Sequence, residues 1–151
     1  MPTHAEKRLL RHRPEQLFDL VADIERYPAF LPWCKACRIR KREPGAGEGA
    51  PEVLVADMAI GFKVFRETFT SRVVRTPPDR IDVSYAEGPF KYLNNHWVFL
   101  DHPDGCEIDF FVDFEFRSRV LQTAIGAVFN EAVQRMIQAF ELRADELYGG
   151  S

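Results

Sequence analysis

The first feature of the sequence that could carry chemistry is a pair of closely spaced cysteines. Cys34 and Cys37 lie within residues 33–37, which have the spelling of a thioredoxin-type redox motif. That chemistry needs a thiolate at the start of a helix that follows a buried strand. Here Pro28 and Pro32 precede the pair, and a basic segment without helical periodicity follows it. The sequence therefore argues against redox chemistry.

A zinc site is the second use that the cysteines suggest. Cys34, Cys37 and Cys106 would supply thiolates, and His96 or His102 would complete the set. Structural zinc sites pair two closely spaced ligands with a second close pair, and that second pair is missing here. We therefore expect no metal site.

The remaining catalytic and phosphate-binding patterns are incomplete. The alternating glycines of residues 45–49 are followed by Pro51 and a strand-like run, whereas a phosphate loop leads into a helix. Ser71, Ser84 and Ser118 have no nucleophile elbow and no identifiable base. We expect no catalytic residue and no required cofactor, and a cyclase-like enzyme remains a minor alternative.

A basic run follows the cysteines, with five cations in eight residues: Lys35, Arg38, Arg40, Lys41 and Arg42. Such a run is typical of a solvated edge strand, where charge prevents pairing between sheets. It would also suit a patch for anionic lipid headgroups or ribosomal RNA. With the neighbouring apolar residues Phe30 and Trp33, it forms a candidate surface for contact with a membrane or a ribosome.

The length and composition set the broad class. The chain has 151 residues, which predicts one domain over 1–151. Thirteen phenylalanines must face either a core or an apolar ligand, because the ring has no polar group. The net charge of −3 does not suggest a dedicated nucleic-acid binder, and no apolar run is long enough to span a membrane. Three cysteines and no secretory signal indicate a cytoplasmic protein.

The elements that would position these residues follow from the hydrophobic periodicity. Residues 3–11 predict a strand, and an amphipathic helix begins at Pro14 and ends before Pro28. Residues 34–117 predict about six strands separated by turns, of which residues 108–116 alternate most clearly. Residues 118–147 predict one long helix with a wide apolar stripe. This order predicts an α+β domain with a curved antiparallel sheet of six to seven strands against the C-terminal helix.

An ordered set of short motifs resembles a known family. These are Tyr27-Pro28 with residues 30–34, residues 60–63, 69–73 and 88–91, Trp97 with Phe99, residues 114–116, and the helical positions between 125 and 149. Together they are similar to the START-like helix-grip superfamily, which includes polyketide cyclase/dehydrase-like proteins. Within it, they resemble the coenzyme-Q-binding and ribosome-association toxin family.

The resemblance implies a helix-grip (START/Bet v 1-like) fold with two short helices after the first strand. It also implies a non-enzymatic carrier for ubiquinone or a similar isoprenoid lipid, supporting respiratory electron transport and quinone biosynthesis at the inner membrane surface. The alternative that it leaves open is a regulator that binds the large ribosomal subunit and blocks subunit association. The oligomeric state is not indicated.

The cavity that such a carrier needs would be apolar, with a few polar groups to orient the ligand. Strand alternation and helical spacing predict these lining residues: Phe62, Phe65, Phe69, Tyr85, Trp97, Phe99, Phe110, Phe114, Val128, Phe129, Ala132 and Met136. The same alternation turns Glu67 and the Tyr85 hydroxyl inward as candidate contacts for a quinone head. The alternative for all of them is an ordinary core, with Glu67 in a rim ion pair and the Tyr85 hydroxyl in water.

Overall fold

The computed structural model describes residues 3–31, 34–45, 50–62, 65–77 and 79–149, without the side chains of Phe62 and Phe65. The elements follow in the order β1 (Thr3–Leu10), α1 (Pro14–Ala22), a 3-10 helix (Ile24–Arg26), α2 (Tyr27–Phe30), β2 (Cys34–Glu43), β3 (Glu52–Phe62), β4 (Phe65–Thr76), β5 (Arg80–Glu87), β6 (Phe90–His102), β7 (Gly105–Phe116) and α3 (Arg119–Tyr148).

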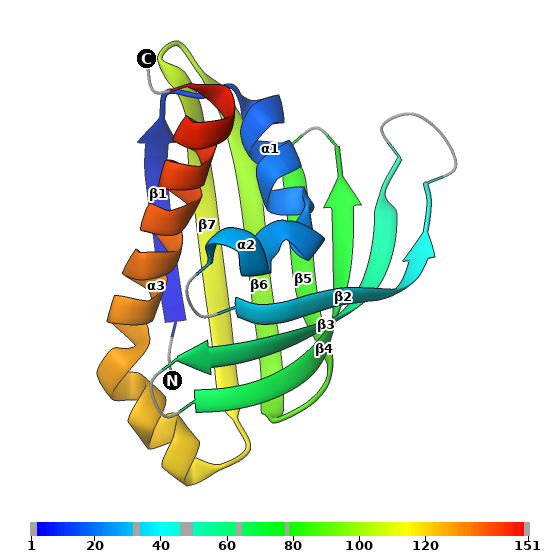
Figure 1. Cartoon of the computed structure of the whole chain (residues 1–151), viewed down its shortest axis with the longest axis vertical. Coiled ribbons are helices and arrows are strands. Elements are labelled where there is room, and N and C mark those ends of the chain that lie inside the picture. The colour runs from blue at the N-terminus through cyan, green and yellow to red at the C-terminus, as the bar shows by residue number, and fades with distance from the viewer. Residues whose placement is uncertain (1–2, 32–33, 46–49, 63–64, 78, 150–151) are drawn as a thin grey trace.

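The described strands form one antiparallel sheet in the order β1-β7-β6-β5-β4-β3-β2. Figure 1 shows that β2, β3 and β4 sweep across the fold almost at right angles to β1 and β7. Register shifts interrupt the pairing of β2 with β3, of β4 with β5 and of β6 with β7. Such shifts mark β-bulges or similar irregularities, which bend strands and increase their twist, and they account for part of this curvature.

The helices cover the concave face of the sheet. α3 lies along β1 and β7. α1 and α2 cross the sheet beside the C-terminal half of α3 (Figure 1). The buried residues of α3 recur at helical spacing: Ile125, Val133, Ile137, Phe140 and Ala144. On β7, Ile108, Phe110, Phe114 and Phe116 are buried on the inner face, as the alternation predicts. The α+β architecture predicted from the sequence is therefore confirmed.

The first helix is shorter than predicted. α1 ends at Ala22, and the chain continues as a 3-10 helix and the four-residue α2. The apolar residue Ile24 continues the helical spacing of α1 but belongs to the next element. Periodicity alone could not detect this break, because Ile24 is buried at a position that a continuous helix would also bury.

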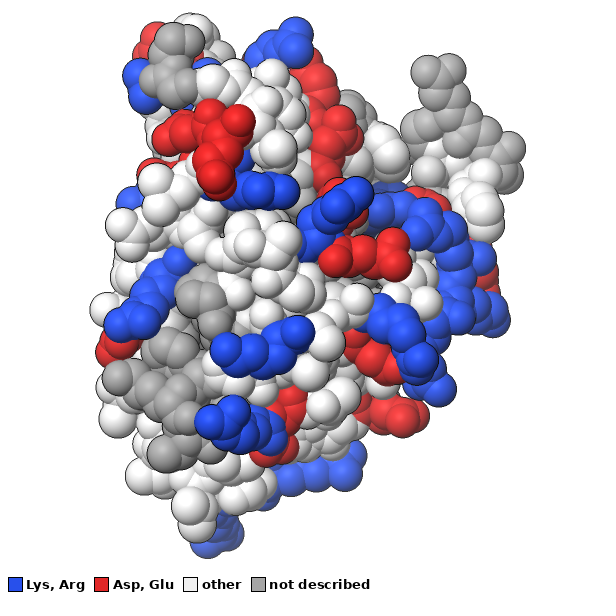
Figure 2. Space-filling model, viewed as in Figure 1, with Lys and Arg blue, Asp and Glu red and all other residues white. Residues whose placement is uncertain are grey.

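β2 is an edge strand, as one interpretation of its charges predicted. All five of its cations are exposed, and Figure 2 shows blue side chains over this edge with red ones between them. Arg38 and Arg40 lie 3.3 and 3.5 Å from Asp57, and Lys41 lies 3.1 Å from Glu43. The hydrogen bond from Thr70, with the charges of Arg38 and Arg40, holds the pKa of Asp57 below its ordinary value. Much of the positive charge is therefore balanced within the sheet.

Among the described residues, no helix is both long and apolar enough to cross a membrane.

Candidate functional site

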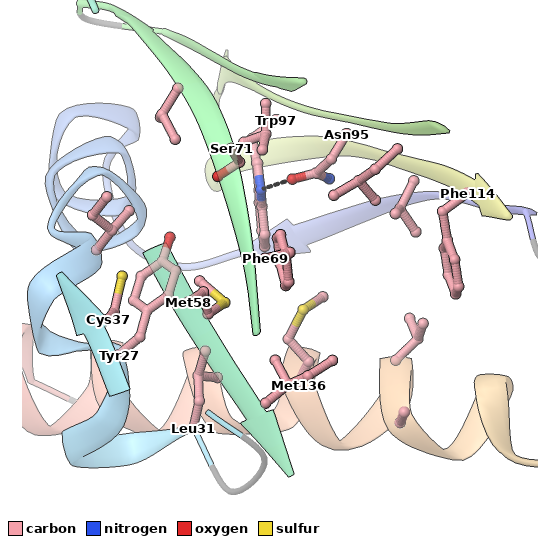
Figure 3. Close-up of a pocket in the computed structure, with 18 of the residues that line it drawn as sticks. Tyr27, Leu31, Cys37, Met58, Phe69, Ser71, Asn95, Trp97, Phe114 and Met136 are labelled. Carbon is pink, nitrogen blue, oxygen red and sulfur yellow. Dashed lines mark hydrogen bonds between the residues drawn. The ribbon is translucent and has the colours of Figure 1, made fainter. Parts of the chain in front are cut away.

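A cavity of about 230 Å³ lies between the concave face of the sheet and α3 (Figure 3). α3 and the segment from the 3-10 helix through α2 contribute to its wall together with strands β2 to β7. Its described lining consists of Ile24, Tyr27, Leu31, Cys37, Ala56, Met58, Ile60, Phe69, Ser71, Val73, Ile81, Val83, Phe90, Leu93, Asn95, Trp97, Phe110, Val112, Phe114, Phe116, Ile125, Phe129, Ala132, Val133, Met136 and Phe140.

The lining is almost entirely apolar. Its described polar groups are the hydroxyls of Tyr27 and Ser71, the Asn95 amide, the Trp97 indole N–H and the Cys37 thiol. No Asp, Glu, Lys, Arg or His belongs to the described lining. An apolar surface of this kind favours an apolar ligand, since a charged ligand would lose its hydration without gaining a partner. It also offers no acid and base pair for proton transfer.

Seven of the residues that the sequence analysis named belong to the described lining. Phe69, Trp97, Phe110 and Phe114 face the cavity from strands, and Phe129, Ala132 and Met136 face it from α3. Rings of this group touch one another, with 4.6 Å between the centroids of Trp97 and Phe110 and 5.4 Å between those of Phe114 and Phe129. Their role in ligand binding stays a prediction. The predicted side chains of Phe62 and Phe65 lie outside those that the structure describes.

The placement of Phe99 in the cavity is wrong. Phe99 shares the inner face of β6 with Trp97, but it lies where α1 covers the sheet. Its ring meets the Phe18 ring of α1 edge-on at 6.0 Å, and only 2% of the residue is exposed. Phe99 is therefore a core residue, because α1 fills the space that the cavity occupies further along the strand.

Tyr85, Val128 and Glu67 are also absent from the described lining. The Tyr85 hydroxyl accepts a hydrogen bond of 3.2 Å from the Phe90 backbone N–H. This bond leaves the hydroxyl hydrogen available to donate, so the predicted contact with a quinone head stays a prediction. Val128 packs instead against the cluster that contains Phe90 and Phe114. Glu67 is half-buried on β4, nearer than Phe69 to the N-terminal end of the strand, and its contact with a ligand head stays a prediction.

The sequence analysis missed many apolar lining residues and, among the polar ones, Asn95 and Ser71. Asn95 and Ser71 stand within apolar alternations, Leu93-Asn95-Trp97 and Phe69-Ser71-Val73. A polar residue on the apolar face of a strand is a recognisable signal, because burial of a polar group requires a partner. The Tyr27 hydroxyl satisfies this requirement by donating to the Val21 carbonyl.

The candidate membrane or ribosome surface is only partly defined. Lys35, Arg38, Arg40, Lys41 and Arg42 are all exposed on β2. Phe30 is half-buried, with its ring 5.2 Å from the Phe140 ring and the Arg143 guanidinium 5.5 Å above it. Trp33 lies outside the described residues. Phe30 therefore belongs partly to the packing between α2 and α3.

The cysteines lie in an environment that suppresses thiolate chemistry. Cys34 and Cys37 lie on a strand, and burial raises their pKa values to about 11 and about 12. At neutral pH both are thiols, whereas redox exchange needs the thiolate. Among the described residues, no group of three or more His, Cys, Asp or Glu side chains is arranged to hold a metal ion.

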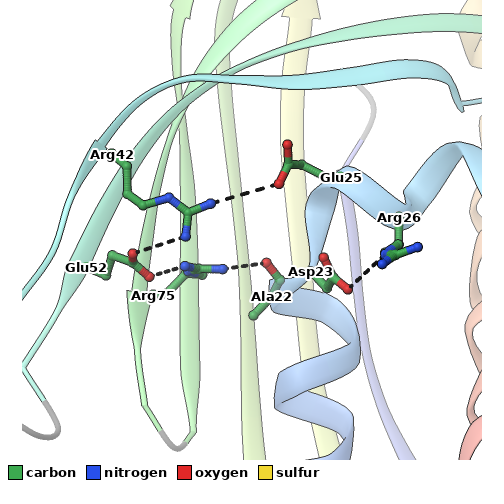
Figure 4. A network of polar contacts seen from close by, with 7 residues as sticks. All are labelled: Ala22, Asp23, Glu25, Arg26, Arg42, Glu52 and Arg75. Atoms are coloured by element: carbon green, nitrogen blue, oxygen red, sulfur yellow. Dashed lines mark hydrogen bonds and ion pairs between the residues drawn. The ribbon is translucent and has the colours of Figure 1, made fainter.

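A polar network attaches the end of α1 and the 3-10 helix to the sheet (Figure 4). Arg75 of β4 pairs with Glu52 of β3 and donates a 2.9 Å hydrogen bond to the Ala22 carbonyl at the end of α1. Arg42 of β2 lies 3.6 Å from Glu52 and 3.9 Å from Glu25 of the 3-10 helix. The network therefore joins three strands to the segment that places Ile24, Tyr27 and Leu31 in the cavity wall.

Replacing Arg75 tests this network. Arg75→Ala is expected to lower the free energy of unfolding by about 1–3 kcal/mol, since it leaves Glu52 and the Ala22 carbonyl with fewer partners. Arg80→Ala is the control, because its ion pair with Asp82 is exposed and should contribute less than about 1 kcal/mol. Urea unfolding followed by tryptophan fluorescence measures both. Equal effects of the two substitutions would contradict a structural role for the network.

The thiols provide a test by pH. At pH 8, iodoacetamide should modify Cys34 and Cys37 slowly in the folded protein and readily in urea, as measured by mass spectrometry. Folding raises these pKa values above the ordinary 9.0. The contribution of the two thiols to the free energy of unfolding is therefore present below about pH 9 and is lost as the pH rises through about 11 to 12. Rapid modification of the folded protein at pH 8 would contradict the burial of these thiols.

The chain is 41% identical over 144 residues to the "Ribosome association toxin RatA" of Rickettsia prowazekii, covering 93% of this chain and 94% of the relative. It is 30% identical over 151 residues to the mitochondrial "Coenzyme Q-binding protein COQ10 homolog B" of Xenopus laevis, covering 97% of this chain and 59% of that protein.

Solved structures share the fold over nearly the whole chain. The solution structure of the 18 kDa protein CC1736 from Caulobacter crescentus has a TM-score of 0.81 at 37% identity, covering 99% of this chain and 100% of that one. A START superfamily protein from Mycobacterium smegmatis has a TM-score of 0.78 at 18% identity, covering 96% and 98%, and this likeness shows the fold alone. Residues 10–141 match the family model described as polyketide cyclase / dehydrase and lipid transport. The chain therefore belongs to the polyketide cyclase / dehydrase and lipid transport family.

Proposed function

We propose that this protein is a non-enzymatic carrier that binds an isoprenoid quinone or a similar elongated lipid in the cavity beneath α3. The observation that carries the proposal is the cavity itself, whose described lining is apolar and uncharged. A hydrophobic lipid gains free energy in such a space in proportion to the apolar area that it removes from water. A curved sheet and one helix keep this space open between them.

The volume indicates how such a lipid would sit. An engineered protein cavity of about 150 Å³ holds benzene, so about 230 Å³ accommodates a substituted ring and the beginning of a tail. A long isoprenoid chain exceeds this space, and the rest of its tail would extend from the cavity. Met58 and Met136 suit a wall of this kind, because the unbranched thioether side chain adapts to irregular apolar shapes.

The quinone class is supported by similarity, and the carrier role by the absence of catalytic groups from the described lining. One relative is named as a coenzyme Q-binding protein, and the family description includes lipid transport. The description also includes cyclases and dehydrases, but the described lining has no carboxylate, imidazole or ammonium to move a proton. A ligand that is held and released unchanged fits these residues best.

Lipid analysis with a blocked variant tests the proposal. Protein purified gently from a quinone-producing bacterium should carry a near-stoichiometric isoprenoid quinone, measured by extraction and mass spectrometry. Ala132→Phe fills the cavity from α3 and should remove the lipid, whereas Ala127→Phe makes the same change on the exposed face of α3 and should retain it. Wild-type protein that carries no lipid and takes up no added quinone would refute the carrier function.

Ribosome association is a second candidate, favoured by the names of several relatives and by the exposed cations of β2. RNA phosphates would compete with Asp57 and Glu43 for these cations, and such binding weakens steeply with salt. The same strand could instead contact anionic lipids at the inner membrane, where a carrier would exchange its cargo.

Charge reversal separates these partners. Combined Arg38→Glu, Arg40→Glu and Lys41→Glu substitutions should weaken co-sedimentation with large ribosomal subunits about tenfold or more if β2 binds RNA. Ala132→Phe is the matched control and should leave co-sedimentation unchanged. Loss of binding only to anionic liposomes would assign the strand to the membrane, and unchanged binding to both would exclude β2 as a docking surface.

A further inference from the structure

Ser71 presents an unused hydrogen-bonding group to the cavity. The residue lies on β4, belongs to the cavity lining and is only 4% exposed. No hydrogen bond joins its hydroxyl to another described residue, and the hydroxyl keeps some accessible surface, since Arg143 Nε is the only fully buried side-chain polar atom without a partner among the described residues. A ligand atom in the cavity would supply the missing partner.

The local strand geometry turns Ser71 toward this space. The preceding residue, Thr70, faces the opposite side of the sheet, where its hydroxyl donates to Asp57 at 2.6 Å. The pairing with β5 shifts register between Thr70 and Ser71, which is typical of a bulge that redirects a side chain. On the neighbouring strand β3, Ser71 pairs with Ala56, whose small side chain leaves room in front of the hydroxyl.

Asn95 offers a second donor on the same face of the sheet (Figure 3). Its Oδ1 accepts a 3.2 Å hydrogen bond from the Trp97 indole, and its Nδ2 donates at 2.7 Å to the Phe111 carbonyl. These partners fix the orientation of the amide, because an indole N–H can only donate and a carbonyl can only accept. One N–H of Nδ2 is left without a partner among the described residues.

The two donors, and the lack of charged residues in the described lining, define which lipid head group fits the cavity. We propose that the Ser71 hydroxyl and the Asn95 amide bind acceptor oxygens of a neutral ring, so that the lipid enters the cavity head first. β5 lies between β4 and β6, and on it Ser71 pairs with Tyr85 whereas Asn95 pairs with Val83, so the backbones of Ser71 and Asn95 lie somewhat more than about 10 Å apart. A ring with oxygens on opposite edges, as in a quinone, spans this interval. A fatty-acid carboxylate would find no cation among the described lining residues. This inference rests on the proposed carrier function.

Three probes and two variants test it by isothermal titration calorimetry. The probes are a benzoquinone with a short alkyl tail, an alkylbenzene with the same tail and no oxygen, and oleate. Ser71→Ala should weaken quinone binding about three- to tenfold and change alkylbenzene binding less than about twofold, because one hydrogen bond is lost. Val83→Ala removes apolar contact from the neighbouring strand and should weaken both probes alike. Oleate should bind more weakly than the quinone at neutral pH.

The outcomes separate the inference from the function on which it rests. If the wild type binds both ring probes but Ser71→Ala affects them equally, or affects neither, the anchoring of the head by Ser71 is wrong and the carrier function stands. If oleate binds as tightly as the quinone, the neutral head is wrong. If the wild type binds none of the probes, the carrier function fails and the inference fails with it. Circular dichroism and urea unfolding confirm that each variant is folded.

Discussion

A strongly curved sheet and a single long helix cannot fill the space between them with side chains alone. Close packing normally leaves few voids larger than a water molecule in a protein interior. Here the inner face carries small residues at Ala56 and Ser71, and α3 presents Ala132 toward them. Larger buried side chains form two clusters around them, one that includes Phe99 and Trp97 and one that includes Phe90 and Phe114. The cavity between these clusters follows from the shape of the fold.

The rest of the structure maintains this shape. Shifts in strand pairing accompany the curvature of the sheet, and α1 packs against Phe99 at one end. Arg75 and Arg42 tie the segment after α1 to three strands, so that Ile24, Tyr27 and Leu31 form part of the wall. The charges needed for this attachment lie outside the cavity. Polarity inside it is reduced to a few neutral groups, which favours recognition of an apolar molecule with acceptor oxygens.

The sequence predicted the elements, and it named seven of the residues in the described cavity lining, because periodicity reports which face of an element is buried. The alternation along residues 108–116 and the helical spacing after residue 118 led to Phe110, Phe114, Phe129 and Met136. Periodicity does not report what covers a face at each point along it. Phe99 therefore could not be distinguished from Trp97 before the position of α1 was known. Ser71 and Asn95 were detectable as polar residues within apolar alternations, but their partners depend on the strand register.

A crystal structure of the protein with a short-tailed benzoquinone tests whether the cavity holds the ring of a neutral lipid. We expect electron density for the ring between the sheet and α3, with oxygens within hydrogen-bonding distance of the Ser71 hydroxyl and the Asn95 amide. Density only on the outer surface, or a cavity closed by the side chains of Phe69, Phe129 and Met136, would contradict it.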